Sequence, residues 1–376
     1  MVDPTQEPTA SARRRPSRVV YVAPESTAGG VGHYSDVFVE ELRRQIDDVI
    51  EFRHPGPGTD TVATLRRRHR AILEAVDVPG PVALHAELSG GSVESFWPTA
   101  FVERRVPSVV STATVHDPPG VVWLPGRTRL LSKSRVASHA LHYPGRPVTR
   151  AVERCVIGDR SMFALTHAGA DSLRTAFPRA TVHHVPLLVL DRPEIAPAHE
   201  RPRAVGMFGL VYRGKGFEHI SRIRAALDPS IALRVAGRGT EALPPVEGVE
   251  ILGGLDGSDL DDFFGSVRTL LVPYGQRTLY GPVFPASSVA AHAIAYLTPL
   301  VSTAHGALAE MADDGGAVVV GGPDDDADPI PALSAAAQSL VDDDARLRRL
   351  VDELTVVRAD RSPRNVVNRF VDVWSR

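Results

Sequence analysis

The sequence predicts an α/β protein built from two doubly wound domains in tandem, each a mostly parallel sheet wrapped by helices. The chain has 376 residues, which is too many for one ordinary hydrophobic core. Short apolar runs alternate with helix-like segments along its whole length, as is typical of parallel sheets. The alternation stops once, at a polar stretch with three prolines at residues 191–202, and then begins again. We therefore expect a linker there, and a ligand site where carboxyl ends of strands face a cleft between the domains.

Apolar runs of strand length define the first domain, residues 18–190, which follows a polar tail at residues 1–17 that we expect to be disordered. The predicted strands cover residues 18–23, 48–52, 81–87, 107–115, 162–166 and 181–185. Helical periodicity is found at residues 33–45, 60–76, 92–105 and 168–177.

The second domain, residues 203–360, repeats the pattern. Its predicted strands are residues 204–208, 231–236, 249–252, 269–272, 300–302 and 317–320, and its predicted helices are 216–227, 258–267, 287–296, 307–312, 330–344 and 344–360. A last segment, residues 361–376, forms a helix with one apolar stripe that must be buried, and the first domain is one place for it to pack.

Composition limits the class of protein. Hydrophobic residues make up 43% of the chain and charged residues 23%, the net charge is −3, and no apolar run is long enough to span a bilayer. Cys155 is the only cysteine, which excludes an internal disulfide and a thiolate metal site. No secretory signal is found at the N-terminus. We expect a soluble cytoplasmic protein without a nucleic-acid partner.

The first segment with chemical interest is the glycine-rich turn at residues 28–34, between the first strand and a helix. Gly30 and Gly32 let the backbone approach an anion, and free N–H groups at the helix start attract phosphate. The full dinucleotide fingerprint is absent. A tight turn that binds no ligand is an equally good interpretation.

A second segment ends an apolar strand in His116-Asp117, followed by two prolines. Both side chains are therefore expected at the carboxyl end of a strand, where open α/β sheets collect ligands. His116 can donate to a sugar hydroxyl or to a developing charge, and Asp117 can fix its tautomer. The alternative is a loop histidine bonded to backbone.

The third segment is a strand, a glycine-rich loop and a helix at residues 207–217. Gly209 ends the strand, and Arg213 and Lys215 bring two cations to a loop that also offers backbone donors. A diphosphate needs this combination for charge neutralisation. No Ser or Thr follows the lysine, so the loop is not a Walker motif.

The fourth segment follows the strand that ends at Pro273 and leads into an alanine-rich helix. Ser287 and Ser288 stand at the expected helix N-terminus, and His292 lies about one turn further on. Serine hydroxyls and free amides there suit a second phosphate contact. Ordinary N-capping explains either serine alone.

These four segments, in this order, resemble the retaining GT-B glycosyltransferases known as glycosyl transferases group 1, over nearly the whole chain. The resemblance implies two Rossmann-like domains facing each other across a cleft. It implies transfer of a sugar from a UDP- or GDP-sugar to a hydroxyl acceptor, with retention and without a required metal or cofactor. By motif, Gly30 and Gly32 would lie near the donor phosphate and the acceptor, and His116 near the transferred sugar. Arg213 and Lys215 would bind the diphosphate.

The chain departs from this family at one important place. Many members carry two glutamates seven residues apart, and those positions hold Phe284 and His292 here. The segment is similar instead to a subgroup in which Ser287-Ser288 would contact phosphate and Glu310, which matches an acidic residue of the next helix, would help to bind the donor. His292 could still bond a ribose hydroxyl. Gly239 and Leu255 match loops that surround the nucleobase in the family.

The missing glutamate pair leaves alternatives to a transferase. One is a non-catalytic relative that binds a glycan or a partner protein. Another is a sugar-nucleotide epimerase on the same fold, although few acidic groups are present to serve it. The acidic run at residues 323–326 could pass for a metal site, and we interpret it as a surface turn.

A basic surface is expected near the apolar residues Val121–Leu124. The basic residues after Trp123 are Arg127, Arg129, Lys133, Arg135, Arg146, Arg150, Arg154 and Arg160, opposed only by Glu153 and Asp159. This basic surface has two interpretations. It could make peripheral contact with an anionic inner membrane face, which would favour a lipid-linked acceptor, or it could be a solvated helix face.

Overall fold

The computed structural model describes residues 14–275, 281–322 and 327–375. The first part of the predicted tail and the acidic run at residues 323–326 lie outside the described residues. Contacts within the chain divide the described part into two compact units. Unit 1 contains residues 14–113, 122–161 and 367–375, and unit 2 contains residues 114–121 and 162–366.

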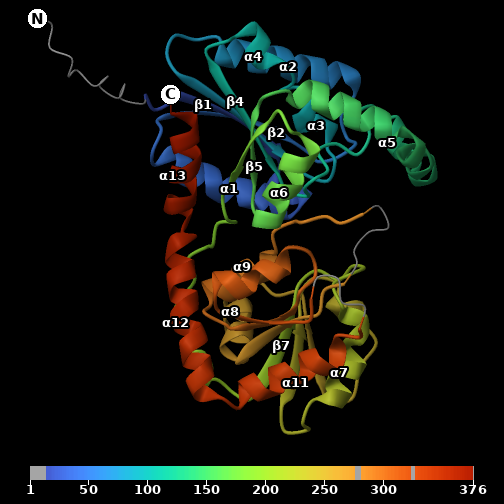
Figure 1. Cartoon of the computed structure of the whole chain (residues 1–376), viewed down its shortest axis with the longest axis vertical. Coiled ribbons are helices and arrows are strands. Elements are labelled where there is room, and N and C mark those ends of the chain that lie inside the picture. Colours follow the sequence, from blue (N-terminus) through green and yellow to red (C-terminus); the bar gives the residue numbers. More distant parts are fainter. Residues whose placement is uncertain (1–13, 276–280, 323–326, 376) are drawn as a thin grey trace, which may run out of the picture. The chain divides into compact units, whose positions relative to one another are not determined.

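The first sheet has six strands in the order β2-β1-β3-β4-β5-β6. The strands are β1 Arg18–Pro24, β2 Asp48–His54, β3 Val82–Leu88, β4 Val109–Val115, β5 Ser161–Ala164 and β6 Thr181–His184. The helices that alternate with them are α1 Gly30–Arg43, α2 Val62–Val76, α3 Val93–Phe96, α4 Val102–Arg105, α5 Arg135–Ile157 and α6 His167–Ala176 (Figure 1). β1 pairs in parallel with both β2 and β3.

The second sheet also has six strands, in the order β12-β11-β10-β7-β8-β9. They are β7 Ala204–Phe208, β8 Ala232–Ala236, β9 Val249–Gly253, β10 Thr269–Val272, β11 Leu300–Thr303 and β12 Ala317–Val320. The helices are α7 Ile220–Ala226, α8 Gly257–Gly265, α9 Ser288–Ala295, α10 Met311–Asp314, α11 Ile330–Val341, α12 Asp344–Asp360 and α13 Pro363–Trp374. Single 3-10 turns lie at Ser26–Ala28, Leu131–Lys133, Ala198–Glu200, Phe217–His219, Thr240–Ala242 and Gly306–Glu310.

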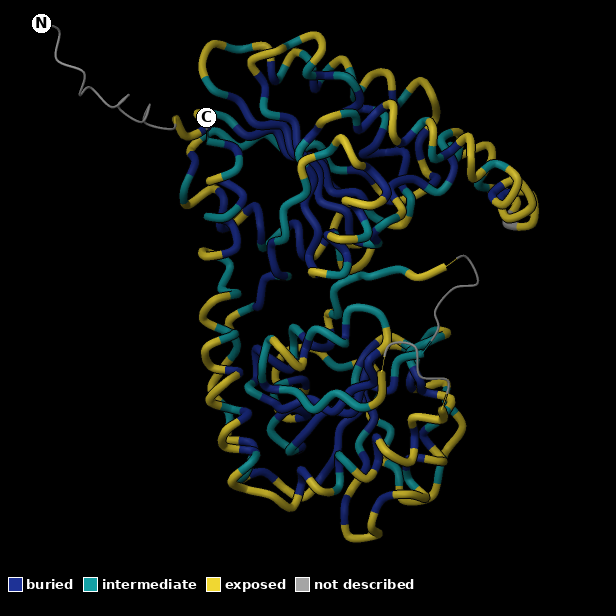
Figure 2. Tube along the Cα trace, in the orientation of Figure 1, coloured by how far each residue is buried: buried dark blue, intermediate teal, exposed yellow. Residues whose placement is uncertain are grey.

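The predicted fold class is confirmed, because each sheet is wound with helical crossovers and every predicted strand is present. Figure 2 shows the strands of each sheet buried and the helices exposed along their outer faces. Two predictions about helices are wrong. The single helix expected at residues 92–105 is two short helices, because Phe101 has a positive φ of 58° and starts a new turn. The helix α5 was not expected, because Pro144 and Pro147 lie inside it.

The C-terminal helix α13 contributes its apolar stripe to the core of unit 1. The Trp374 indole donates from Nε1 to Thr112 Oγ1 over 2.9 Å, and its ring lies 5.4 Å from that of buried His85. Phe370 makes an edge contact with Phe38 at 4.9 Å. These aromatic contacts therefore bury part of the apolar stripe that the sequence of α13 predicted.

Within the described residues, no helix combines the length and the apolar character that crossing a bilayer requires.

Candidate functional site

The strand order of the second sheet creates a switch point between β7 and β10, from which the chain winds in opposite directions. The loop after β7 and the residues after β10 meet there. A Cβ added to Gly216 would lie 2.2 Å from the carbonyl oxygen of Pro273, so only glycine fits. The Gly275 amide donates to the Gly214 carbonyl over 3.1 Å. The predicted diphosphate loop is thus held against the end of β10 by its backbone.

The loop after β7 also bonds through two amides to the segment at the carboxyl end of β8. The Gly209 amide donates to Ala236 O over 3.0 Å, and the Val211 amide donates to Arg238 O over 3.1 Å. A Cβ on Gly237 would lie 2.1 Å from the Gly209 oxygen. Gly239, one of the two predicted nucleobase-side residues, has a φ of 92° and lies against Val211.

The second of these residues, Leu255, lies in the loop after β9. It is half-buried and packs on the core between the sheet and α8–α9. The Gly237 amide joins this strand to β8 by donating to Gly253 O over 2.7 Å. The carboxyl ends of β7, β8, β9 and β10 therefore form one connected rim.

Both predicted cations lie on this rim. The ammonium of Lys215 stands 3.7 Å from the centre of the Tyr274 ring and 5.2 Å from that of Tyr212, which positions it by cation–π attraction. Arg213 is exposed and makes no hydrogen bond or ion pair with any described residue. One cation is fixed by aromatic rings, and the other can reach an anion without breaking an existing bond.

The first turn of α9 adjoins the same loop. A Cβ on Gly209 would lie 3.0 Å from Val289 Cγ2, so the helix start abuts the loop after β7. Ser287 caps the helix, accepting the Ala290 amide at Oγ over 3.3 Å, while Ser288 is exposed. The predicted capping interpretation of Ser287 therefore holds. The exposed Ser288 remains available for a ligand.

His292 faces its own helix. Its Nδ1 lies 2.7 Å from the Ser288 carbonyl, so Nδ1–H donates and Nε2 is left as the acceptor nitrogen. The ring centre lies 5.3 Å from that of Phe208, at the end of β7.

His116 and Asp117 follow β4 at its carboxyl end, as predicted, and belong to unit 2. His116 is buried and Asp117 is half-buried. The next carbonyl, that of Pro118, accepts the Phe284 amide over 2.9 Å. The Phe284 carbonyl in turn accepts from Thr166 Oγ1 over 2.9 Å. The His-Asp turn is therefore joined to the segment that leads into α9, which the sequence did not reveal.

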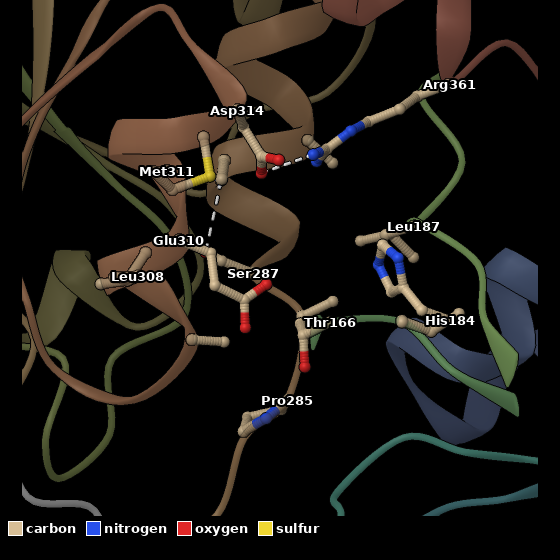
Figure 3. Close-up of a pocket in the computed structure, with 15 residues that line it drawn as sticks. Thr166, His184, Leu187, Pro285, Ser287, Leu308, Glu310, Met311, Asp314 and Arg361 are labelled. Atoms are coloured by element: carbon tan, nitrogen blue, oxygen red, sulfur yellow. Dashed lines mark hydrogen bonds and ion pairs between the residues drawn. The ribbon is translucent and has the colours of Figure 1, made fainter. Parts of the chain in front are cut away.

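Glu310 has a partner that sequence reasoning missed. Its carboxylate accepts the His167 amide over 2.8 Å and the Ala168 amide over 2.5 Å, so it binds the first turn of α6. Figure 3 shows this carboxylate beside Thr166 and Ser287 in a small pocket. The carboxylate that the family resemblance assigns to a donor sugar nucleotide is here engaged by a helix N-terminus.

Gly30 and Gly32 lie in unit 1, at the start of α1. Gly32 is packed so closely that a Cβ would lie 2.0 Å from the Glu25 carbonyl oxygen. Gly30 has open space around it and lines a cavity of about 200 Å³ with His54, Glu87 and Ser92. The glycine turn therefore borders a polar recess at the carboxyl ends of β1, β2 and β3.

Sequence reasoning did not identify two of the residues in this recess. Glu87 is fully buried, accepts from Tyr21 Oη over 2.6 Å and lies 3.2 Å from His85 Nε2. Burial, with Arg68 and Arg53 nearby, lowers the pKa of His54 to about 3. His54 is therefore uncharged at neutral pH, with its Nε2 2.8 Å from Ser95 Oγ.

No group of three or more His, Cys, Asp or Glu side chains suited to a metal ion is found in the described ranges.

The two glycines of the α1 turn provide a matched pair of variants. Gly32→Ala should lower the free energy of unfolding by about 2 kcal/mol, since backbone must move to admit the new methyl group. Gly30→Ala should change it by less than about 0.5 kcal/mol, because nothing lies within 4 Å of the added carbon. Denaturant unfolding of both variants checks this, and equal effects would contradict it.

The lowered pKa of His54 predicts how the stability of the fold depends on pH. Its folded pKa is about 3, below the unfolded value of 6.5, so its stabilising contribution is present above pH 6.5 and lost as the pH falls. The loss is at most about 1.4 kcal/mol per pH unit. His54→Gln should reduce the slope of unfolding free energy between pH 4 and 6.5. Ser95→Ala should retain the slope, because the buried imidazole still titrates. An unchanged slope in His54→Gln would refute the assignment.

The sequence matches no protein-family model and no curated protein. Solved structures with the same fold span almost all of it. Sucrose-phosphate synthase from Thermosynechococcus elongatus has a TM-score of 0.63 at 15% identity, covering 95% of this chain and 98% of that one. HepE from Anabaena, in complex with UDP and glucose, scores 0.64 at 11% identity, covering 94% and 98%. A glycosyltransferase from Rickettsia africae scores 0.63 at 10% identity, covering 95% and 97%. The expected resemblance is confirmed at the level of architecture: this chain has the GT-B fold of these glycosyltransferases.

Proposed function

We propose that the protein transfers a sugar from a nucleotide-sugar donor to a hydroxyl acceptor. The observation that carries this proposal is the rim of unit 2, where the loop after β7 carries Arg213 and Lys215 and abuts the first turn of α9. Two cations and free helix amides suit the diphosphate of such a donor. HepE, a structure with the same fold, contains UDP and glucose, or UDP-glucose, in its complexes.

The proposed chemistry is electrostatic. The bond between the anomeric carbon and the diphosphate oxygen breaks, and a bond from that carbon to the acceptor oxygen forms, while the acceptor proton passes to the departing phosphate. Arg213, Lys215 and the α9 amides stabilise the charge that develops on the diphosphate. No carboxylate among the proposed donor-binding residues serves as a nucleophile, so we infer direct transfer with retention and no covalent intermediate. The cations make a metal ion unnecessary for neutralisation.

The remaining predicted residues take supporting roles in this proposal. His116 faces the transferred sugar, with Asp117 fixing its tautomer, and Ser288 and Nε2 of His292 are further donor contacts. From the family resemblance, we propose that the glycine turn at Gly30 and Gly32 contributes to binding of the acceptor and the donor phosphate. The backbone around Gly239 and Leu255 receives the base, for which UDP and GDP are the candidates.

A second candidate is a non-catalytic protein that binds a nucleotide, a glycan or a partner. The engagement of Glu310 by α6, together with Phe284 and His292 at the positions of the glutamate pair, favours it. The two candidates separate when the protein is incubated with a panel of UDP- and GDP-sugars. Slow hydrolysis of one sugar supports the transferase, and thermal stabilisation without any turnover supports the binding protein.

Lys215 tests the proposed diphosphate site. Lys215→Ala should weaken the binding of UDP or GDP by about 1.5–3 kcal/mol, the range for hydrogen bonds to charged groups. Arg213→Ala should act in the same direction. Arg348→Ala removes an exposed cation of α12 and should leave the affinity unchanged. Calorimetry measures all three, and an unaltered affinity in a folded Lys215→Ala protein would refute the site.

His116 tests the position of the transferred sugar. His116→Ala should reduce turnover by roughly 100- to 1,000-fold, as loss of one transition-state donor does, while nucleoside-diphosphate affinity changes little. His116 is buried, so thermal unfolding must show that the variant folds. Turnover and affinity that fall together would place His116 away from the sugar.

A further inference from the structure

The long helix α5 of unit 1 buries several polar side chains and exposes several apolar ones. Its buried side chains include the polar residues Ser138, His142, Thr149 and Glu153. Its exposed side chains include an apolar stripe at helical spacing: Val136, Ala137, Ala140, Leu141, Pro144, Pro147, Val148 and Ala151. A helix on the surface of a protein in water normally has the opposite arrangement.

Two of the buried polar side chains of α5 have partners that hold the helix in place. Nδ1 of His142 lies 3.1 Å from the Trp123 carbonyl, and the two rings stack at 3.5 Å. Glu153 accepts the Val122 amide over 2.9 Å and pairs with Arg150 at 3.2 Å. These bonds set the rotation of the helix and direct its apolar stripe to the outside.

The outward stripe continues into the turn before the helix. Leu130 is 75% exposed, Val136 80% and Val148 66%, and Leu131, Leu141 and Tyr143 are also exposed. Elsewhere in the described ranges, exposed large apolar side chains are scattered, at Val62, Leu210, Leu252 and Val356. A concentration of this kind marks a surface that a partner covers. Figure 2 shows exposed residues along α5, in the position labelled in Figure 1.

Charge identifies the kind of partner. No Asp or Glu occurs between Asp117 and Glu153, and Glu153 is buried. Basic side chains on this segment that are exposed include Arg129, Lys133 and Arg146. A second copy of the chain would bring like charges together across a symmetric contact, whereas an anionic lipid surface complements both the cations and the apolar stripe.

We propose that Leu130, Leu131 and the apolar stripe of α5 dock into the interfacial layer of an anionic membrane. The docking residues differ from the segment Val121–Leu124 that the sequence suggested. Val121, Val122 and Leu124 are buried in the protein, so that expectation was wrong for these three residues, whereas Trp123 is half-buried. The proposal does not depend on the glycosyl transfer proposed above.

Co-sedimentation of the full chain with vesicles tests the proposal. Vesicles that contain phosphatidylglycerol should bind the protein, and vesicles of phosphatidylcholine alone should bind it far more weakly. Binding should fall as salt is added, because the Debye length shortens from roughly 10 Å at 0.1 M to 3 Å at 1 M. A salt-resistant remainder should persist from apolar burial.

Two variants separate the charged and apolar parts. Arg129→Gln with Lys133→Gln should lower the partition coefficient roughly 30-fold, since each cation contributes a factor of about 5 near an anionic surface. Leu141→Ser with Val148→Ser should remove most of the salt-resistant remainder. All four side chains are exposed, so both variants should fold with an unchanged thermal midpoint.

Matched controls lie on α12 of unit 2. Arg348→Gln with Arg349→Gln removes two exposed cations, Val356→Ser removes an exposed valine, and both variants should bind vesicles like the unaltered protein. Equal binding to neutral and anionic vesicles, or none at low salt, would overturn the proposal. So would a dimer in solution that Leu141→Ser with Val148→Ser converts to monomer without any change in vesicle binding, since the stripe would then be a contact between copies.

Discussion

The candidate site depends on the close approach of backbone segments at the carboxyl ends of β7, β8 and β10. Gly209, Gly216 and Gly237 each stand where a side chain would collide with a neighbour, with backbone oxygens 2.2 Å and 2.1 Å from a Cβ on the last two. Because these residues lack side chains, the loops bond directly to one another. The rim is then rigid enough to hold the first turn of α9 and the Lys215 ammonium in fixed places. The positions of the Lys215 loop and of the first turn of α9 follow from this packing.

A second consequence is that the site is constructed mostly from backbone and cations, with little free negative charge. Phe284 stands where many related proteins have a glutamate, and its main chain bonds to Pro118 and Thr166. The Glu310 carboxylate lies at the N-terminus of α6, where the helix dipole favours a negative charge. A ligand that carried its own negative charge would therefore meet donors and cations, which fits a diphosphate better than a cationic or neutral group.

Most strands of both sheets could be predicted because they are short, mainly apolar runs bounded by turn residues, although β2 and β6 are more polar. The glycine-rich loops could be predicted as tight turns because glycine lets the backbone turn sharply between a strand and a helix, whereas their binding of phosphate stays a prediction. Contacts between residues far apart in sequence could not be predicted. Glu310 and Ala168 are 142 positions apart, and nothing in the local pattern of either indicates the other. The cavity near Gly30 was missed for the same reason, since Glu87 and His54 come from different strands.

The helix α5 shows a different limit, and its prolines bear on how it can be used. Sequence rules exclude Pro144 and Pro147 from a helix interior because proline donates no backbone hydrogen bond and crowds the preceding turn. Inside α5 both prolines are exposed, on the face that carries the apolar stripe. Neither proline has an N–H to donate to the turn before it, and a helix that lacks such internal backbone bonds is costly in the hydrocarbon core of a bilayer but not at its water-exposed surface. These two prolines explain why the helix was not predicted. They also favour shallow docking of α5 among lipid head groups over deep insertion.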